Sequence, residues 1–123
     1  AEGALGEIGS VLLRMRELAV QSASSTVSDT NRDSINAELT QLVSEIDRIA
    51  AVTEFNGQAL LNGAASTGIT LQVGLDNDTN DQIKASIGNT YASKLGDSNF
   101  INAQHVSTVA LAQSAMTVID AAI

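Results

Sequence analysis

The sequence predicts a mainly α-helical fold: an elongated antiparallel bundle of three heptad helices, with a small β-hairpin between the second and third helices. The 123 residues include no proline, so nothing forbids long uninterrupted helices. Hydrophobic residues make up 44% but aromatic residues only 2%, which favours an aliphatic core between helices over an aromatic-rich β-sandwich. Three stretches place apolar residues at alternating intervals of three and four, as in helices that pack lengthwise. We therefore expect a single domain over residues 1–123.

The first helix is expected over about residues 2–22. Its apolar residues form one continuous seam, namely Leu5, Ile8, Leu12 and Met15. A second apolar row repeats at intervals of seven and consists of Ala4, Val11 and Leu18. The apolar face is therefore wider than contact with one neighbour requires. Either the helix touches two neighbours or part of this row is an external contact face.

The second helix is expected over about residues 30–52, after a small, polar connection. Ser28 or Thr30 is a suitable N-cap residue. The seam of this helix repeats the same spacing without a fault, with Ile35, Leu39, Leu42, Ile46 and Ile49. Its polar face carries Arg32, Glu38, Glu45 and Arg48, and such a face is ordinarily solvated.

The third helix is expected over about residues 102–123. Its seam residues are Val109, Met116 and Ile119, with Ala112 and Ile123 in the same series. Leu111 and Val118 make a second apolar row, seven residues apart. Three heptad segments in a short chain favour the elongated antiparallel bundle.

The region of about residues 55–88 has a different pattern. Asn56-Gly57 and Asn62-Gly63 are turn signals. Apolar and polar residues then alternate over 69–73 and again over 83–87, which predicts two half-buried strands. We expect a β-hairpin packed against one end of the bundle, followed by a loop or poorly ordered linker over about residues 89–101.

Charge and composition exclude several functions. The net charge is −8, with fourteen acidic and six scattered basic residues, so binding to nucleic acid or to an anionic membrane surface is not expected. The chain has no cysteine, and no apolar run approaches the roughly 20 residues that span a bilayer.

The sequence begins without methionine and ends within a helical pattern, so we expect it to be truncated at both ends.

No group of residues predicts catalysis, a cofactor or a metal. The run Asp76–Asp81 resembles the start of a calcium loop, but it has Asp81 where the turn glycine belongs and Ile87 where a bidentate glutamate belongs. A solvated acidic tip is the simpler interpretation. His105, the single histidine, has no neighbouring second ligand. The chain is therefore not expected to be an enzyme.

Several segments match the motifs of a known family. Residues 14–22 read R-M-R-E-L-A-V-Q-S, which resembles the R-x-R-E-L-A-V-Q-S segment of bacterial flagellins, and residues 37–49 resemble the following helix of that family. The turn at Phe55-Asn56-Gly57 is similar to the family's F-N-G turn, and residues 71–74 are similar to its hairpin strand. Residues 119–123 look like the start of its returning helix. The likeness is most specific over residues 1–75.

The resemblance implies the helical core domain of a secreted, extracellular structural subunit of the motility filament. It implies self-association in the full-length parent, an export chaperone for that parent, and recognition by the flagellin-sensing Toll-like receptor of animals. The family's receptor contacts fall on Arg14, Leu18, Gln21 and Glu38. Leu18 equally suits simple packing in the bundle, and Leu42 stands where related flagellins often have arginine. The alternatives are a hook–filament junction protein, or a cell-surface binding module built on the same core.

Overall fold

The computed structural model describes residues 1–76, 78–96 and 99–123. Three α-helices lie side by side: α1 (Glu2–Ala23), α2 (Asp29–Val52) and α3 (Val109–Ala122). Two hairpins follow α2, the first with β1 (Glu54–Phe55) and β2 (Gln58–Ala59), and the second with β3 (Ile69–Gln72) and β4 (Gln82–Ala85). The predicted fold class, three helices with a small antiparallel hairpin, is confirmed.

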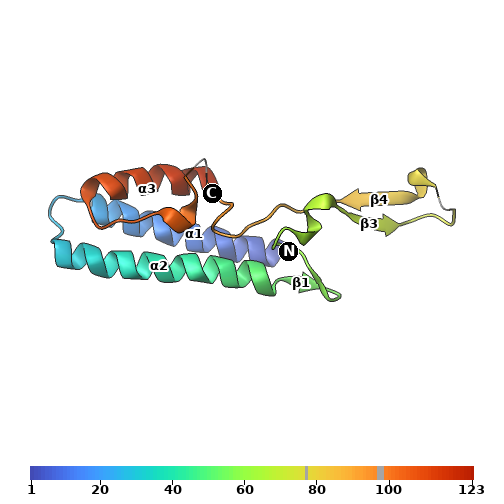
Figure 1. Cartoon of the computed structure of the whole chain (residues 1–123), viewed down its shortest axis with the longest axis horizontal. Helices are drawn as coiled ribbons and strands as arrows, with labels where there is room; N and C mark the ends of the chain where they lie inside the picture. Colours follow the sequence, from blue (N-terminus) through green and yellow to red (C-terminus); the bar gives the residue numbers. More distant parts are fainter. Residues whose placement is uncertain (77, 97–98) are drawn as a thin grey trace.

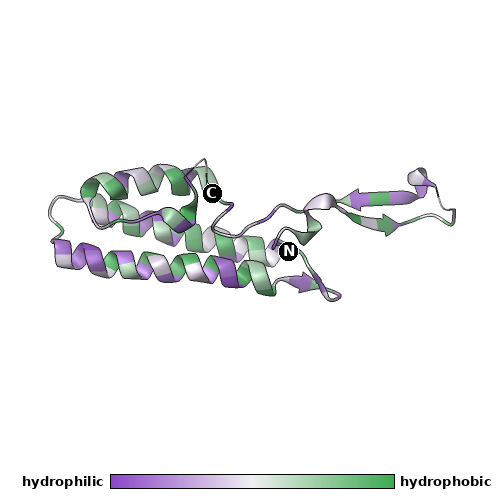
Figure 2. Cartoon of the chain, in the orientation of Figure 1, coloured by the Kyte–Doolittle hydropathy of each residue, from purple (hydrophilic) through white to green (hydrophobic). Residues whose placement is uncertain are grey.

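The helix ends follow local signals. The Ser28 side chain accepts a hydrogen bond from the Asn31 amide and so begins α2, as one of the two proposed caps. α1 and α2 agree with their predicted ranges to within a residue at each end. In Figure 2, apolar and polar colours alternate along all three helices, as expected when one face of each is buried.

The third helix is shorter than predicted. It begins at Val109, where the sequence pattern gave about residue 102. Thr108 caps it by accepting a hydrogen bond from the Leu111 amide at 3.2 Å. Before this cap, Ile101–Ala103 form a single 3-10 turn and the chain is then extended. Ile101 and Val106 are both fully buried, so their apolar character belongs to core packing and not to a helical repeat.

The segment before α3 is not a loose linker where the structure describes it. We call residues 89–96 and 99–108 the strap. The strap lies along the helices in Figure 1, and it contributes Ala92, Ile101 and Val106 to the buried core. Of the two alternatives predicted for residues 89–101, the poorly ordered linker is wrong for the described residues, which form an irregular loop packed on the core up to the 3-10 turn at Ile101–Ala103. Asp97 and Ser98, also inside that predicted linker, lie outside them.

Most predicted seam residues are buried. Eight are less than 9% exposed: Ile8, Leu12, Met15, Ile35, Leu39, Ile46, Ile49 and Ile119. Leu42, Val109 and Met116 are partly buried. Leu5 is 43% exposed, so its assignment to the core is wrong. α3 lies toward the far half of α1 and leaves the start of α1 without a second neighbour (Figure 1).

The β3–β4 hairpin extends beyond the bundle (Figure 1). Its strands pair antiparallel with Ile69 opposite Ala85 and Leu71 opposite Ile83. Leu71 and Ile83 are more than half exposed, which contradicts the prediction of a hairpin packed on the bundle. Leu60, Leu61 and Ala65, in the chain leading to β3, are buried instead, so the hairpin itself starts where the core ends.

The β1–β2 hairpin was not predicted as a pair of strands, although its turn was. Phe55 pairs with Gln58, which leaves Asn56 and Gly57 as a two-residue loop. Both loop residues have positive φ, 52° and 75°, the conformation that favours Asn-Gly in such turns.

Candidate interaction surface

An ion pair on the bundle surface links α1 to α2. The Arg14 guanidinium donates through Nε and Nη2 to Glu38 Oε1, at 3.1 and 2.9 Å, and through Nη1 to Glu17 Oε2 at 3.2 Å. The hydrogen bond to Glu38, and then that to Glu17, raise the pKa of Arg14 above its usual value. Both Arg14 and Glu38 remain about half exposed. This surface therefore presents opposite charges paired across α1 and α2.

Gln21 and Leu18, the other two residues predicted to contact the receptor, differ from each other in exposure. Gln21 is exposed on α1, two turns beyond Arg14. Leu18 is only 1% exposed and belongs to the core cluster, so the interpretation as an exposed anchor is wrong and the packing alternative is correct. The reason is that α1 packs against both α2 and α3, which buries the second apolar row at Leu18.

A different apolar row of α1 is exposed. Leu13 and Val20, seven residues apart, are 54% and 50% exposed. With Arg16, Glu17 and Gln21 they line a shallow hollow of about 490 Å³. This row was not predicted from the sequence, although its two residues stand seven apart there. Residue spacing alone does not say which of several apolar rows faces the neighbouring helices.

Further ion pairs border the helices. Arg16 Nε lies 2.6 Å from Asp120 Oδ1, which joins α1 to α3 and raises the pKa of Arg16. Within α2, Arg48 donates two hydrogen bonds to the Glu45 carboxylate, at 2.8 and 2.6 Å. These bonds lower the pKa of Glu45 and raise that of Arg48. All four side chains are about 40% exposed or more, so each pair adds little to stability.

Arg32 is buried, contrary to its predicted place on a solvated polar face. Its side chain is 5% exposed and its hydrogen bonds reach into the turn between α1 and α2. The guanidinium donates to the main-chain oxygens of Ser22, Ser24 and Val27, the last two at 2.9 and 3.0 Å. A cation here satisfies carbonyl groups that the end of α1 leaves without helical partners. Arg32 therefore ties the end of α1 and the following turn to the first turns of α2.

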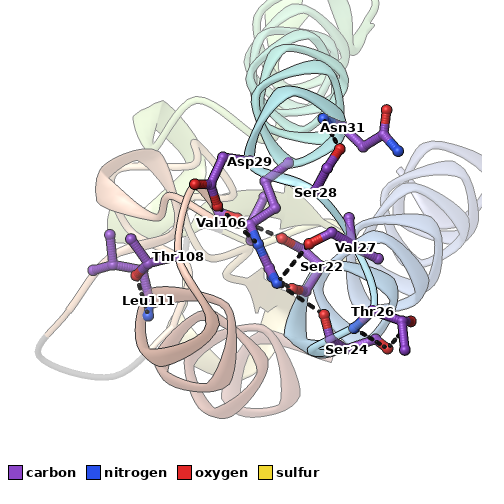
Figure 3. A network of polar contacts seen from close by, with 11 residues as sticks. Ser22, Ser24, Thr26, Val27, Ser28, Asp29, Asn31, Val106, Thr108 and Leu111 are labelled. Atoms are coloured by element: carbon purple, nitrogen blue, oxygen red, sulfur yellow. Dashed lines mark hydrogen bonds and ion pairs between the residues drawn. The ribbon is translucent and has the colours of Figure 1, made fainter.

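Side chains of α1 and α2 hold the strap in place. The Asp47 carboxylate accepts the Ala92 amide at 2.8 Å, and the Asn36 side-chain oxygen accepts the Val106 amide at 3.0 Å. Ser22, fully buried near the end of α1, donates its hydroxyl to the Val106 carbonyl (Figure 3). The strap is thus bonded at both ends of its course along the bundle.

The residues that the structure describes contain no group of three or more histidine, cysteine, aspartate or glutamate residues able to hold a metal ion. His105 is exposed, and the Asp76–Asp81 tip is described except at Asn77, which lies outside the described residues. In the part of the chain that the structure covers, every helix is too short or too polar to span a bilayer.

Comparisons with known proteins agree with this arrangement. The sequence model described as the bacterial flagellin N-terminal helical region matches residues 1–66. A flagellin of Salmonella paratyphi A is 54% identical over 76 residues, covering 62% of this chain and 15% of that protein. A flagellin of Clostridium tyrobutyricum is 39% identical over 128 residues, covering 100% of this chain and 34% of that protein.

The comparison with solved structures also finds flagellins. The crystal structure of Bacillus cereus flagellin matches with a TM-score of 0.78 and 32% sequence identity, over 98% of this chain and 66% of that one. The chain thus spans only part of the length of the relatives that it matches. The sequence match, the three-helix core and its hairpin together show that this chain belongs to the bacterial flagellin family.

Proposed function

We propose that this chain is the helical core of a structural subunit of the bacterial flagellar filament, an extracellular protein that associates with copies of itself and is not an enzyme. The observation that carries the proposal is the match to Bacillus cereus flagellin over nearly the whole chain, hairpin included. Because the chain covers a minority of its curated relatives, the role belongs to the parent protein that contains this core. An export chaperone is part of the same proposal for that parent.

Two surfaces support self-association. The exposed row of Leu13 and Val20 on α1 lies between charged residues, as is typical of an interface that is apolar at its centre and polar at its rim. The β3–β4 hairpin exposes Leu71, Val73 and Ile83, side chains that a monomer would usually bury. Neither surface is covered by the chain itself.

Immunogold electron microscopy of cells that make the parent protein tests this function. Antibodies raised against this chain should label extracellular filaments along their length. Label restricted to the junction between hook and filament would favour the junction-protein alternative. Label over the cell surface without filaments would favour a surface binding module, and either result would refute the proposal.

We also propose that the α1–α2 surface is a ligand for the flagellin-sensing Toll-like receptor. The support is the exposed Arg14–Glu38 pair with Gln21 nearby, but not Leu18, which is buried. A receptor reporter assay should lose response for Arg14→Ala while Arg48→Ala, a matched exposed arginine on α2, retains it. Equal responses from the two variants would contradict this role.

A further inference from the structure

The chain contains two Asn-Gly pairs that differ in how firmly they are held. Asn56-Gly57 forms the loop of the β1–β2 hairpin, and Asn62-Gly63 precedes the short 3-10 helix η1 (Ala64–Thr67). Asparagine followed by glycine is the most reactive context for loss of the side-chain amide, because glycine leaves its own main-chain nitrogen unhindered. The surroundings of each pair therefore decide which one reacts.

The Asn56 side chain is free to react. It is exposed, and it has no hydrogen bond to any residue that the structure describes. Apart from Gly57 and its two chain neighbours, no residue has an atom within 4 Å of the position where a side chain on Gly57 would begin. The two residue pairs of the β1–β2 ladder hold the loop, together with the hydrogen bond that the Leu60 amide donates to the Thr53 carbonyl at 3.0 Å. Asn56 has a φ of 52° that opening the loop would relax.

Asn62 is restrained by several contacts. Its side-chain oxygen accepts the Ala64 amide at 3.0 Å, and the Gly63 carbonyl accepts both the amide and the hydroxyl of Ser66 at 3.1 and 2.6 Å. The Asn89 side chain packs directly on Gly63, with its Nδ2 only 2.8 Å from the position of an added Cβ. Asn62 itself is partly buried. Ring closure there would have to break these contacts.

We propose that Asn56 is a site of spontaneous deamidation, a covalent modification site that Asn62 does not share. The main-chain nitrogen of Gly57 attacks Asn56 Cγ and forms a new C–N bond, while the side-chain nitrogen leaves as ammonia. Water then opens the five-membered succinimide at either carbonyl, giving aspartate or isoaspartate. The inference does not depend on the proposed function.

The product changes the hairpin. A new carboxylate stands two residues from Glu54 in the sequence of a chain whose net charge is already −8. Isoaspartate also adds one carbon to the main chain, so the two-residue loop no longer fits the pairing of Phe55 with Gln58. Modification at this position therefore weakens the β1–β2 hairpin beside the apolar surface formed by Phe55, Leu60 and Ile69.

Timed incubation of the chain at mildly alkaline pH tests the proposal. Peptide mapping by tandem mass spectrometry quantifies conversion at both asparagines, and enzymatic methylation counts isoaspartate. In the native protein we expect Asn56 to convert at least about fivefold faster than Asn62, the ratio that about 1 kcal/mol of local restraint produces. In concentrated urea the two rates should become similar. Asn56→Gln, with circular dichroism as the check on folding, should remove most of the native isoaspartate.

Each other outcome overturns the proposal. Equal native rates, or faster reaction at Asn62, would show that the contacts around Gly63 do not protect it. An unchanged rate ratio in urea would assign the difference to sequence neighbours and not to the fold. Absence of conversion at Asn56 in the native chain, with or without conversion in urea, would show that the β1–β2 loop is too rigid to react.

Discussion

Replacing Arg32 with methionine should destabilise the bundle strongly, because the change leaves buried carbonyl groups without a donor. Arg32 serves three main-chain oxygens, and Ser22, which carries one of them, is fully buried. An unsatisfied buried acceptor costs about 1–3 kcal/mol. Ser24 and Val27 are more accessible, so water replaces part of what their carbonyls lose. We expect Arg32→Met to reduce the free energy of unfolding by about 2–3 kcal/mol, a large fraction of a typical total.

Urea unfolding followed by far-UV circular dichroism measures this effect. Arg48→Met is the matched control, since Arg48 lies on the same helix and also makes two side-chain hydrogen bonds, but is 59% exposed. Its effect should be much smaller. Arg32→Lys keeps the charge but lacks the fork that reaches several carbonyls at once, so its loss should be intermediate. Equal unfolding midpoints for Arg32→Met and Arg48→Met would refute the argument that the buried guanidinium stabilises the α1–α2 turn.

Three further changes test the core, the strap and the hairpin tip. Ile46→Asp should abolish cooperative thermal unfolding, because it puts an unpaired charge at a fully buried position. Leu42→Asp should lower the melting temperature less, because Leu42 is only partly buried. The reverse order of the two variants in thermal melts would contradict the seam as described. Gly96→Ala should lower stability by about 1–3 kcal/mol, because Gly96 has a φ of 102° and a methyl group there would lie 2.8 Å from a side-chain carbon of α3. Gly3→Ala, at an open helical position, should instead be neutral or stabilising in the same denaturation assay. Isothermal calorimetry should detect no calcium uptake by the Asp76–Asp81 tip, and saturable one-to-one binding in the micromolar range would overturn that expectation.

The sequence allowed α1 and α2 to be predicted to within a residue because their signals are local. α2 has an apolar seam without a fault and a serine cap at its start, so its boundaries can be read from its own residues. α1 has no side-chain cap, and its range follows from its apolar spacing alone. The start of α3 could not be found in this way, because Ile101 and Val106 are apolar for a reason that lies elsewhere in the chain. They pack in the strap, and the strap is positioned by Asn36 and Asp47, distant residues of α2.

The interaction surface was harder to predict than the fold. Arg32 looks like any charged residue on a polar helix face, and its burial depends on a turn that gathers three carbonyls around it. Leu18 and Leu13 are both leucines of α1, yet one is buried and the other 54% exposed. Which of the two leucines is buried depends on where α3 packs against α1, and the apolar pattern of α1 alone does not contain that information.

The strap also gives this protein a built-in optical probe. The chain has one tyrosine and no tryptophan, and that tyrosine, Tyr91, lies in the strap partly buried against the core. Its fluorescence therefore arises from the strap alone, whereas the far-ultraviolet dichroism arises mainly from the three helices. Departure of the strap from the bundle and melting of the helices can thus be followed in one sample as two separate signals. Coincident curves would mean that strap and helices unfold as one cooperative unit, and an earlier change in emission would mean that the strap opens first.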